Sequence, residues 1–414
     1  TVWAPGNAPG MVPAGEEIPV FNALVRLLYS RPDAIPEGAY CEQCIEVEGA
    51  YARTGHDGSF SVNGIDPGTV WLVVEKGQFR VARQITLAPG ESSALGQEYT
   101  TLPSVHDSAS GDWVPRIAVA TGSSDHIEDV LGKLGIGGVD GQGTYTPGPG
   151  DSRIDFYGNG GRGDVLGGLL PGLFPIVGRF SDLLENPAQM QQYHIIFVPC
   201  TTTDNSSLLG NQQVLRNIRD YVAMGGKLYV TDWSGEVHDN VFPEQVELGG
   251  GQDTPASAYN RAADTWNSSL FGAADGSSYD SENAEVIDPD LYDWLNGQSG
   301  PTPYGGSGPF NPANLQIVDN WNTITNLRDV VVGKDSEGAD VVDSPYPYVQ
   351  GGQGSSTPKL PLTVTYEPAG CGRVLYSTYH TTETSHTGLV PQERILLYLI
   401  MEIGVCKVGP IVIY

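Results

Sequence analysis

Residues 193–199 read Tyr-His-Ile-Ile-Phe-Val-Pro, and residues 227–230 read Lys-Leu-Tyr-Val. Both are short, continuous apolar runs of the kind that forms a strand buried on its two faces. Between them, the pair Gly225-Gly226 would end a helix. Five apolar side chains fall on one face of that helix: Val214, Leu215, Ile218, Tyr221 and Val222. Buried strands joined by an amphipathic helix predict a parallel sheet with helices on both sides.

The same alternation extends to both sides of this stretch. Residues 116–120 form another apolar run, and residues 125–134 carry apolar side chains at helical spacing behind the capping signal Asp125-x-x-Glu128. Toward the other end, residues 360–366 and 373–379 predict a hairpin around a Gly-Cys-Gly turn. Residues 395–403 are apolar nearly all round, which predicts a buried helix.

We therefore expect a Rossmann-like or flavodoxin-like α/β domain over residues 115–406, interrupted by two long insertions. Residues 137–180 are rich in Gly. Residues 248–350 are rich in Gly, Asn, Asp, Ser, Pro and aromatic residues, with a helix-like piece at 288–295. Loops of this length inside a compact domain normally fold as packed excursions or serve a function. The many Tyr and Trp side chains favour ordered, packed loops.

The first hundred residues follow a different pattern. Turn formers such as Asp57-Gly58 separate short β-type runs. These runs are residues 1–3, 23–29, 59–62, 70–75 and 81–87. Such spacing predicts a multidomain β plus α/β protein, with a β-sandwich over residues 1–102 and a polar linker at 103–114.

Residues 407–414 form a tail whose apolar segment, Val408 to Tyr414, predicts a short strand. Leaving it in water would be unfavourable, because burying a large apolar side chain contributes about 1.5 to 3 kcal/mol. We expect the tail to pack on its own domain or to add to a sheet edge of a neighbouring molecule.

The composition excludes one class of partner. The chain of 414 residues has 21 Lys and Arg against 49 Asp and Glu, a formal net charge of −28. Such a surface repels nucleic acids, which bind clustered basic residues. No apolar run reaches the length of about 18 residues that a membrane-spanning helix needs. The sequence begins with Thr1 and is rich in Asn, Gly and Ser, so we expect an extracellular or cell-surface product whose signal peptide has been removed.

Five cysteines predict disulfides in such a protein. The pair Cys41-x-x-Cys44 has no second such pair and no close His pair, which favours a local structural disulfide over a redox motif or half of a zinc site. Cys371 precedes a late strand and Cys406 follows the last helix, so these two would form a second disulfide. The remaining Cys200 would then be a free, half-buried thiol.

Five elements near the start of the chain, in order, carry a resemblance. They are residues 1–3, 18–20, 23–27, 54–60 and 64–74. Together they resemble the carboxypeptidase regulatory-like domain, a transthyretin-like β-sandwich that is also related to Cna B-type repeats. The resemblance implies a fold and a spacer or stalk role, and no chemistry. The long segment 30–50 departs from that family.

The order of residues 193–199, 225–232 and 372–380 resembles the class I glutamine amidotransferase-like fold, including its trehalose-utilisation-type relatives. The resemblance implies a nucleophilic Cys directly after the strand at 227–230, and a His with a nearby Glu after the strand at 373–379. His380 and Glu383 stand at the latter positions. The elbow, however, reads Thr-Asp-Trp-Ser, with Asp232 where the Cys would be. The resemblance therefore implies an α/β domain without its nucleophile and without glutaminase activity.

Other polar residues at the carboxyl end of the predicted sheet remain candidates for a site. Ser234 could act as a nucleophile with His380 as base, although it lacks the Gly-x-Ser-x-Gly frame of a hydrolase elbow. No metal-ligand spacing such as His-Glu-x-x-His occurs, so we predict no cofactor. The alternative is a calcium ion at the acidic loop Asp275 to Asp293, although this loop lacks the spacing of an EF-hand. Six residues could line a metal or ligand crevice: Asp232, Glu236, His238, Asp239, His380 and His386.

Three functional hypotheses remain open. The first is a secreted, non-catalytic surface or structural protein, a homo-oligomer or polymer that forms an extracellular assembly, an adhesive structure or a filament. The second is a secreted hydrolase-type enzyme with a rebuilt site at the carboxyl edge of the sheet. Its candidate catalytic residues are Asp232, Ser234, Glu236, His380 and Glu383. The third is a carbohydrate-binding protein that uses exposed Trp and Tyr side chains to bind a glycan.

Overall fold

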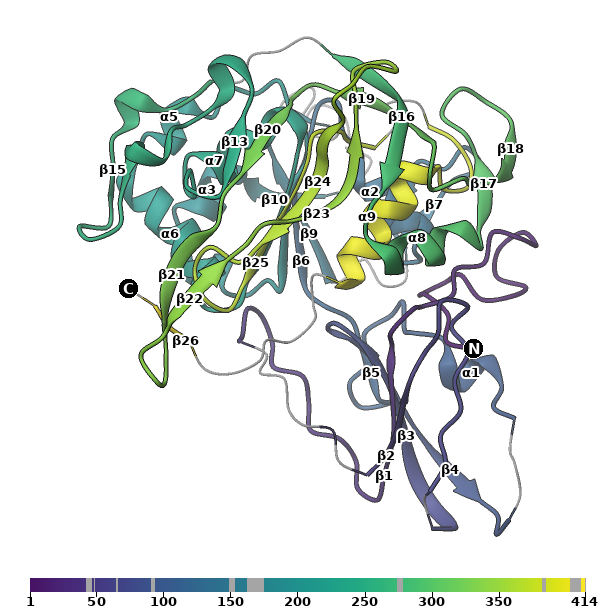
Figure 1. Ribbon diagram of the computed structural model, residues 1–414. Coiled ribbons are helices and arrows are strands. Elements are labelled where there is room, and N and C mark those ends of the chain that lie inside the picture. The colour runs from purple at the N-terminus through teal and green to yellow at the C-terminus, as the bar shows by residue number, and fades with distance from the viewer. Residues whose placement is uncertain are drawn as a thin grey trace.

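The computed structural model of the protein shows two lobes, a smaller N-terminal one and a larger one that holds the rest of the chain (Figure 1). A five-stranded antiparallel sheet forms the first lobe and a ten-stranded mixed sheet forms the second. The chain is therefore a multidomain, β-rich protein of mixed class. The structure describes residues 1–41, 47, 49–64, 66–90, 94–148, 153–161, 175–273, 278–381, 385–402 and 411–413.

The N-terminal sheet has the strand order β2-β1-β3-β4-β5. The predicted strands at 23–29, 70–75 and 81–87 are confirmed, whereas residues 59–62 form no strand. Gly77, at φ 55°, opens the two-residue turn between β3 and β4, where a residue with a Cβ would be strained. The predicted linker ends in β5, which pairs with β4. The strands are β1 (Leu24–Leu28), β2 (Ala50–Arg53), β3 (Gly68–Lys76), β4 (Phe79–Leu87) and β5 (Asp112–Trp113).

The parallel half of the large sheet contains the strands that the apolar runs predicted. Its order is β10-β9-β6-β11-β12-β25, and every neighbouring pair is parallel. The bounds are β6 (Ile117–Ala120), β9 (Ile154–Gly158), β10 (Ile176–Arg179), β11 (Ile195–Val198), β12 (Lys227–Thr231) and β25 (Arg373–Ser377).

The other half is antiparallel and continues in the order β24-β23-β16-β19. The hairpin of β24 with β25 was predicted, but the other strands lie in the segment expected to form loops. That segment is packed as expected, yet it extends the sheet, because alternate residues such as Ile317 and Val349 are buried in the core. The strands are β16 (Tyr279–Val286), β19 (Leu315–Asn320), β23 (Tyr346–Gly351) and β24 (Leu360–Tyr366).

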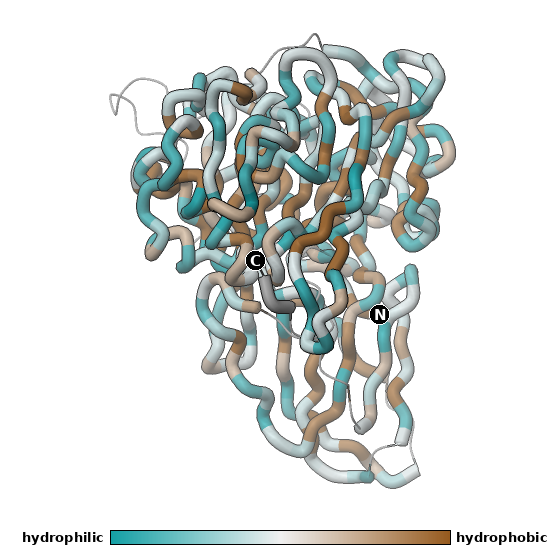
Figure 2. The backbone as a smooth tube through the Cα atoms, turned by 60° about the vertical axis from the view of Figure 1, so that its left-hand side comes forward, coloured by the Kyte–Doolittle hydropathy of each residue, from teal (hydrophilic) through white to brown (hydrophobic). Residues whose placement is uncertain are grey.

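Helices cover both faces of the large sheet. Ile117 and Val119 of β6 pack in one apolar cluster, and their neighbours Ala118 and Ala120 pack in the other. Figure 2 shows apolar stretches of the backbone inside the larger lobe. The first cluster includes side chains of α2 (Ile127–Lys133), α8 (Pro289–Asn296) and α9 (Pro391–Glu402). The second includes side chains of α3 (Phe180–Leu184), α4 (Pro187–Met190) and α6 (Gln212–Ala223).

Short elements complete the described chain. The helices are α1 (Gln97–Thr100), α5 (Ser206–Leu209) and α7 (Glu236–Asp239), which follows the 3-10 turn η2 (Asp232–Gly235). The strand pairs are β7 (Gly138–Val139) with β8 (Tyr145–Thr146), β13 (Val246–Leu248) with β20 (Ile324–Leu327), β14 (Tyr259–Asn260) with β15 (Thr265–Trp266), and β17 (Ser299–Pro301) with β18 (Ser307–Pro309). Among the described residues, no helix has the length and apolar character needed to cross a membrane.

The C-terminal strand β26 (Ile411–Ile413) adds to its own chain. It pairs antiparallel with β21 (Val330–Asp335), whose other partner is β22 (Asp340–Asp343). Of the two expected locations for the tail, the structure shows the one on its own domain. The resulting three-stranded sheet projects beside the larger lobe (Figure 1).

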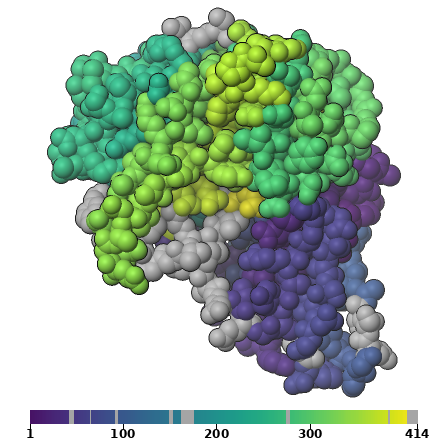
Figure 3. Space-filling view, in the orientation of Figure 1, coloured from purple at the N-terminus to yellow at the C-terminus, as the bar shows by residue number. Residues whose placement is uncertain are grey.

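A disulfide between Cys41 and Cys371 joins the two lobes, with their Cα atoms 5.4 Å apart. The predicted pairings Cys41–Cys44 and Cys371–Cys406 are therefore wrong; Cys44 and Cys406 lie outside the described residues. The two bonded cysteines are 330 residues apart in sequence. Residues 36–41 pack against the segments that precede β11 and β12, where His194 Nε2 lies 3.0 Å from the Pro36 carbonyl oxygen. There the Ala39 N–H donates to the Gln191 carbonyl at 2.9 Å. Figure 3 shows the two lobes in contact on the visible face.

Candidate functional site

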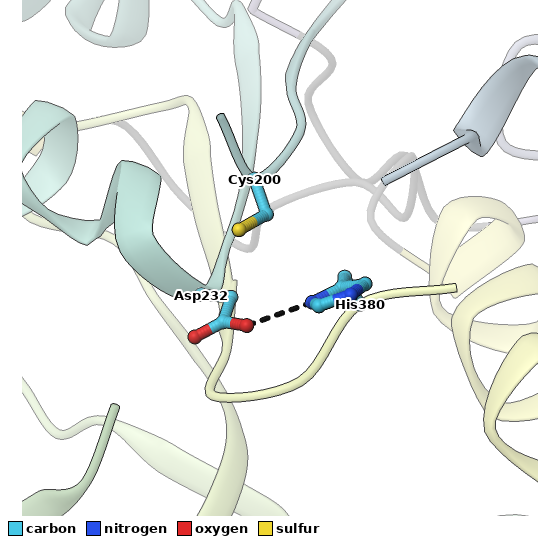
Figure 4. A group of neighbouring side chains, drawn as sticks. All are labelled: Cys200, Asp232 and His380. Atoms are coloured by element: carbon cyan, nitrogen blue, oxygen red, sulfur yellow. Dashed lines mark hydrogen bonds and ion pairs between the residues drawn. The ribbon is translucent and has the colours of Figure 1, made fainter. Parts of the chain in front are cut away.

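Three polar side chains meet at the carboxyl edge of the parallel strands (Figure 4). Cys200 follows β11, Asp232 follows β12, and His380 follows β25. These strands are neighbours in the sheet, so their carboxyl ends bring the three residues together. The sheet order also reverses between β6 and β11, and in open α/β sheets ligands bind beside such a reversal, outside the carboxyl ends of the strands.

The three side chains form a compact, buried cluster. Asp232 Oδ2 and His380 Nδ1 are 2.7 Å apart, and the candidate ligand atoms of all three residues lie within 4.8 Å of one another. Cys200 is 2 % exposed, and Asp232 and His380 are 0 % exposed. The second carboxylate oxygen, Asp232 Oδ1, accepts a hydrogen bond from the backbone N–H of Trp321 at 2.9 Å. The carboxylate therefore holds the imidazole in one orientation.

Asp232 has an unusual backbone. Its φ is 52°, in the left-handed region that disfavours residues with a Cβ. The carbonyl oxygen of Asp232 accepts a hydrogen bond from the Tyr376 hydroxyl at 3.1 Å, which helps to hold this conformation. A sharp turn at the end of a strand is also the geometry of a nucleophile elbow. Here the turn presents a carboxylate, and the thiol comes from the adjacent strand.

Burial and mutual contact set the pKa values of the cluster. Burial raises the pKa of Asp232 to about 7, and its hydrogen bond with His380 offsets only part of that rise. Burial lowers the pKa of His380, but hydrogen bonds with Asp232 and Cys200 outweigh burial and raise it well above the ordinary value. Burial, and then the charge of Asp232, raise the pKa of the Cys200 thiol to about 11. The three groups therefore titrate as a unit.

A second carboxylate ties the strand ends around this cluster. Asp125 Oδ2 accepts a hydrogen bond from the Thr231 hydroxyl, which in turn accepts the N–H of Cys200 at 2.9 Å. Asp125 Oδ1 accepts both the N–H and the hydroxyl of Thr381, at 3.1 and 2.6 Å. The sequence predicted Asp125 as a helix cap, but the helix begins later, with His126 as N-cap. Asp125 instead fixes the positions of Cys200 and of the segment after His380.

The other predicted site residues lie elsewhere. The Ser234 hydroxyl donates to the Pro199 carbonyl at 2.7 Å, so it is not paired with His380 as the sequence suggested. Burial raises the pKa of Glu236 to about 7, beside Asp204. His238 Nδ1 lies 2.8 Å from the Tyr366 hydroxyl. Asp239 accepts the N–H of Thr254, and His386 pairs with Glu393 at 3.0 Å. Glu383 lies outside the described residues.

Cys, Asp and His are also side chains that bind zinc, so the geometry of the cluster bears on a metal. Oxygen and nitrogen ligands that are about 2.0 to 2.2 Å from a tetrahedral ion are more than about 3 Å apart. The separation of 2.7 Å between Asp232 Oδ2 and His380 Nδ1 is that of a hydrogen bond. The arrangement favours a proton between these two atoms.

Sequence reasoning singled out Asp232 and His380 but not Cys200 as a nucleophile, because Cys200 follows the strand at 193–199 and the family pattern places its nucleophile after the strand at 227–230. The structure confirms that Cys200 is a free thiol and shows that it is fully buried rather than half-buried. One signal in the sequence could have found the group. Each of the three residues follows directly, or within three residues, a run that had been identified as a strand of one parallel sheet.

Comparisons with known proteins add little. No family model matches the chain, and no curated protein matches it. Among solved structures, it is similar to the cytoplasmic protein STM3548 from Salmonella typhimurium, with 12% sequence identity and a TM-score of 0.34, over 70% of this chain and 99% of that one. A likeness of this size carries no argument about fold or function.

Proposed function

We propose that the protein is a thiol-dependent hydrolase with Cys200 as nucleophile, His380 as base and Asp232 as the residue that orients the imidazole. The observation that supports this proposal is the contact of Asp232 with His380 Nδ1 beside a free thiol at the carboxyl edge of the sheet. A thiol, an imidazole and an orienting acid within hydrogen-bonding reach are the parts that nucleophilic catalysis requires.

Each group has a role in the proposed reaction. Because Nδ1 of His380 is hydrogen-bonded to Asp232, the neutral form of His380 would take the thiol proton on the other ring nitrogen. The sulfur would attack the carbonyl carbon of an ester or amide, and His380 would return the proton to the leaving group. Water would then hydrolyse the thioester. Burial raises the pKa of the Cys200 thiol, and the contact with His380 and the backbone N–H of Trp233 offset only part of that rise.

Kinetics with p-nitrophenyl acetate test this proposal. We expect the parent protein to release p-nitrophenol, and Cys200→Ser and His380→Asn to lose at least about 100-fold of that rate. His56→Asn is the matched control, because His56 is partly exposed on the N-terminal lobe and pairs with Asp290. Turnover that survives Cys200→Ser would refute the role of the thiol, and a parent without turnover would refute the hydrolase.

The proposal includes a fold type and a location. The strand order β9-β6-β11-β12-β25, with helices on both faces, supports a flavodoxin-like domain of the kind that the amidotransferase-like resemblance implies. The antiparallel N-terminal sheet supports the regulatory-like β-sandwich. The disulfide Cys41–Cys371 supports an extracellular or cell-surface location, since disulfides persist in oxidising compartments. Protease digestion of intact producing cells tests the location: an exposed protein is cleaved.

The full burial of Asp232 and His380 favours a second candidate, in which the cluster is structural and the protein is a secreted, non-catalytic subunit of an assembly. In that case the parent protein shows no turnover, and it forms oligomers whose size depends on strand contacts. Light scattering before and after deletion of residues 409–414 measures this dependence. An unchanged monomer mass in both proteins would eliminate the assembly role of the tail.

A further inference from the structure

A cavity of about 530 Å³ lies next to the Cys200–Asp232–His380 cluster. Residues after β13, β19 and β23 contribute its walls, together with the first residue of β16. Trp321 connects the cavity to the cluster: it lines the cavity, and its backbone N–H donates to Asp232 Oδ1. The volume of the cavity falls within the range of about 300 to 1,000 Å³ that is common for small-molecule sites.

Among the residues that the structure describes, those that line this cavity carry no charged side chain, in a chain of which 17% is charged. A phosphate, carboxylate or ammonium group would be desolvated there without an ionic partner, which is unfavourable. Another cavity, beside β21 and β22, differs in this respect, because Asp288, Asp343, Glu367 and Arg373 line it. The cavity next to Trp321 therefore fits a neutral ligand.

The polar groups in the walls suit a ligand with many hydroxyls. Six of the lining residues have a side-chain amide or hydroxyl: Gln252, Asn322 and Gln353, and Thr323, Ser356 and Thr357. Amides and hydroxyls both donate and accept hydrogen bonds, so they can satisfy hydroxyl groups in either sense. Gly250 adds open backbone, because a Cβ at this position would meet nothing within 4 Å.

Two aromatic side chains, Trp321 and Tyr279, supply apolar surface in the same cavity. Trp321 is held by an edge contact with Trp233, with 4.8 Å between the ring centroids. The Tyr279 hydroxyl donates to the Asn322 carbonyl at 3.2 Å, which fixes that ring as well. The C–H face of a sugar ring is apolar and packs on such a surface, while its hydroxyls point to the polar rim.

We propose that this cavity, defined by Trp321, Tyr279, Asn322, Gln252 and Gln353, binds a neutral saccharide. The inference goes beyond the thiol chemistry and does not depend on it, since none of these residues belongs to the triad. Through Trp321, the ligand would lie one hydrogen bond away from Asp232.

Titration calorimetry with the full-length protein tests the site. The probes are glucose, maltose, cellobiose and N,N′-diacetylchitobiose, with glucuronate, glucosamine and adenosine as charged or non-sugar comparisons. We expect at least one neutral saccharide to bind saturably and more tightly than every comparison compound. Absence of saturable binding by all four saccharides, or tighter binding of adenosine or of a charged sugar, would overturn the proposal.

Variants locate the binding. Trp321→Ala should weaken saccharide binding about tenfold, the size expected for the loss of an aromatic contact. Gln353→Ala, at an exposed rim position, should weaken it severalfold without affecting the fold, and so keeps the test valid if Trp321→Ala does not fold. Trp71→Phe, on the N-terminal lobe, is the control and should bind as the parent does. Equal affinity in the parent and Gln353→Ala would contradict the assignment.

Binding by Cys200→Ser separates this inference from the proposed hydrolase. We expect the variant to bind the saccharide with the affinity of the parent, even though the thiol is gone. If the parent has no turnover but binds the saccharide, the hydrolase proposal fails and the binding site remains. If Cys200→Ser abolishes binding while it stays folded, the site proposed around Trp321 is wrong.

Discussion

Removal of the disulfide between Cys41 and Cys371 should destabilise the protein by several kcal/mol. The bond closes a loop across a sequence separation of 330 residues. In the chain-entropy model, closing a loop of that length restricts the unfolded chain by an entropy worth about 6 kcal/mol at 25 °C. Because measured effects are commonly smaller than the model value, we expect about 3 to 6 kcal/mol for Cys41→Ala combined with Cys371→Ala.

Urea unfolding followed by tryptophan fluorescence and by circular dichroism measures this effect. In the double variant, the N-terminal lobe should separate from the larger lobe before the larger lobe unfolds. The reason is that residues 36–41 still pack near β11 and β12 but are no longer held there by a covalent bond. Cys200→Ser serves as a control for loss of a cysteine that is not in a disulfide. Peptide mapping without reduction should link the Cys41 and Cys371 peptides. A change below about 1 kcal/mol, or a map that links Cys41 to Cys44, would refute the reasoning.

Three further predictions concern the cluster and its supports. His380→Asn should slow alkylation of Cys200 by iodoacetamide at pH 9, because His380 opposes the rise in the thiol pKa; mass spectrometry of the Cys200 peptide measures the rate, and an unchanged rate would contradict the contact. Burial raises the pKa of Asp232 to about 7, above its unfolded value of about 3.9. Between these two pH values the folded state binds more protons than the unfolded state. The free energy of unfolding therefore falls as the pH rises from about 4 to about 7. Asp232→Asn should flatten this slope between pH 4 and 7 in thermal unfolding, and an equal slope in both proteins would show that Asp232 is not its source. Thr381→Val should cost about 1 to 3 kcal/mol in urea unfolding, because the buried Asp125 carboxylate loses the hydroxyl that donates to it; Thr325→Val, at an exposed position, is the control and should change stability little.

The sequence predicted the parallel strands because their side chains are buried on both faces and therefore read as continuous apolar runs. Strands β11 and β12 are buried at every position, and both were identified. Strands β16 and β23 were missed, because each alternates buried with partly exposed or exposed residues and lies in a segment rich in Gly, Asp and Ser. Only the pairing with β24 and β19 makes them part of the sheet, and pairing partners are not visible in one sequence.

The candidate site was predictable in part for the same reason. Asp232 and His380 were found because each follows a recognisable strand. Cys200 was expected to be only a free thiol, because the family pattern places its nucleophile after the strand at 227–230. The sequence predicts both strands of the parallel sheet, but it does not show that they are neighbours. Asp125 was read as a helix cap, since the bond to Thr381, 256 residues away, has no local signature.

The left-handed backbone of Asp232 has a consequence for how this position can vary. Glycine would adopt a φ of 52° without a steric penalty, whereas a residue with a Cβ is less stable there by about 1 kcal/mol or more. If the turn alone mattered, Asp232→Gly would stabilise the protein. The carboxylate, however, accepts the Trp321 N–H and contacts His380, and both contacts would be lost. Asp232→Gly relieves the backbone strain but removes the side chain. Asp232→Asn keeps the backbone strain and removes only the negative charge. A comparison of the two variants therefore separates the effect of the backbone conformation from the effect of the charge at this turn.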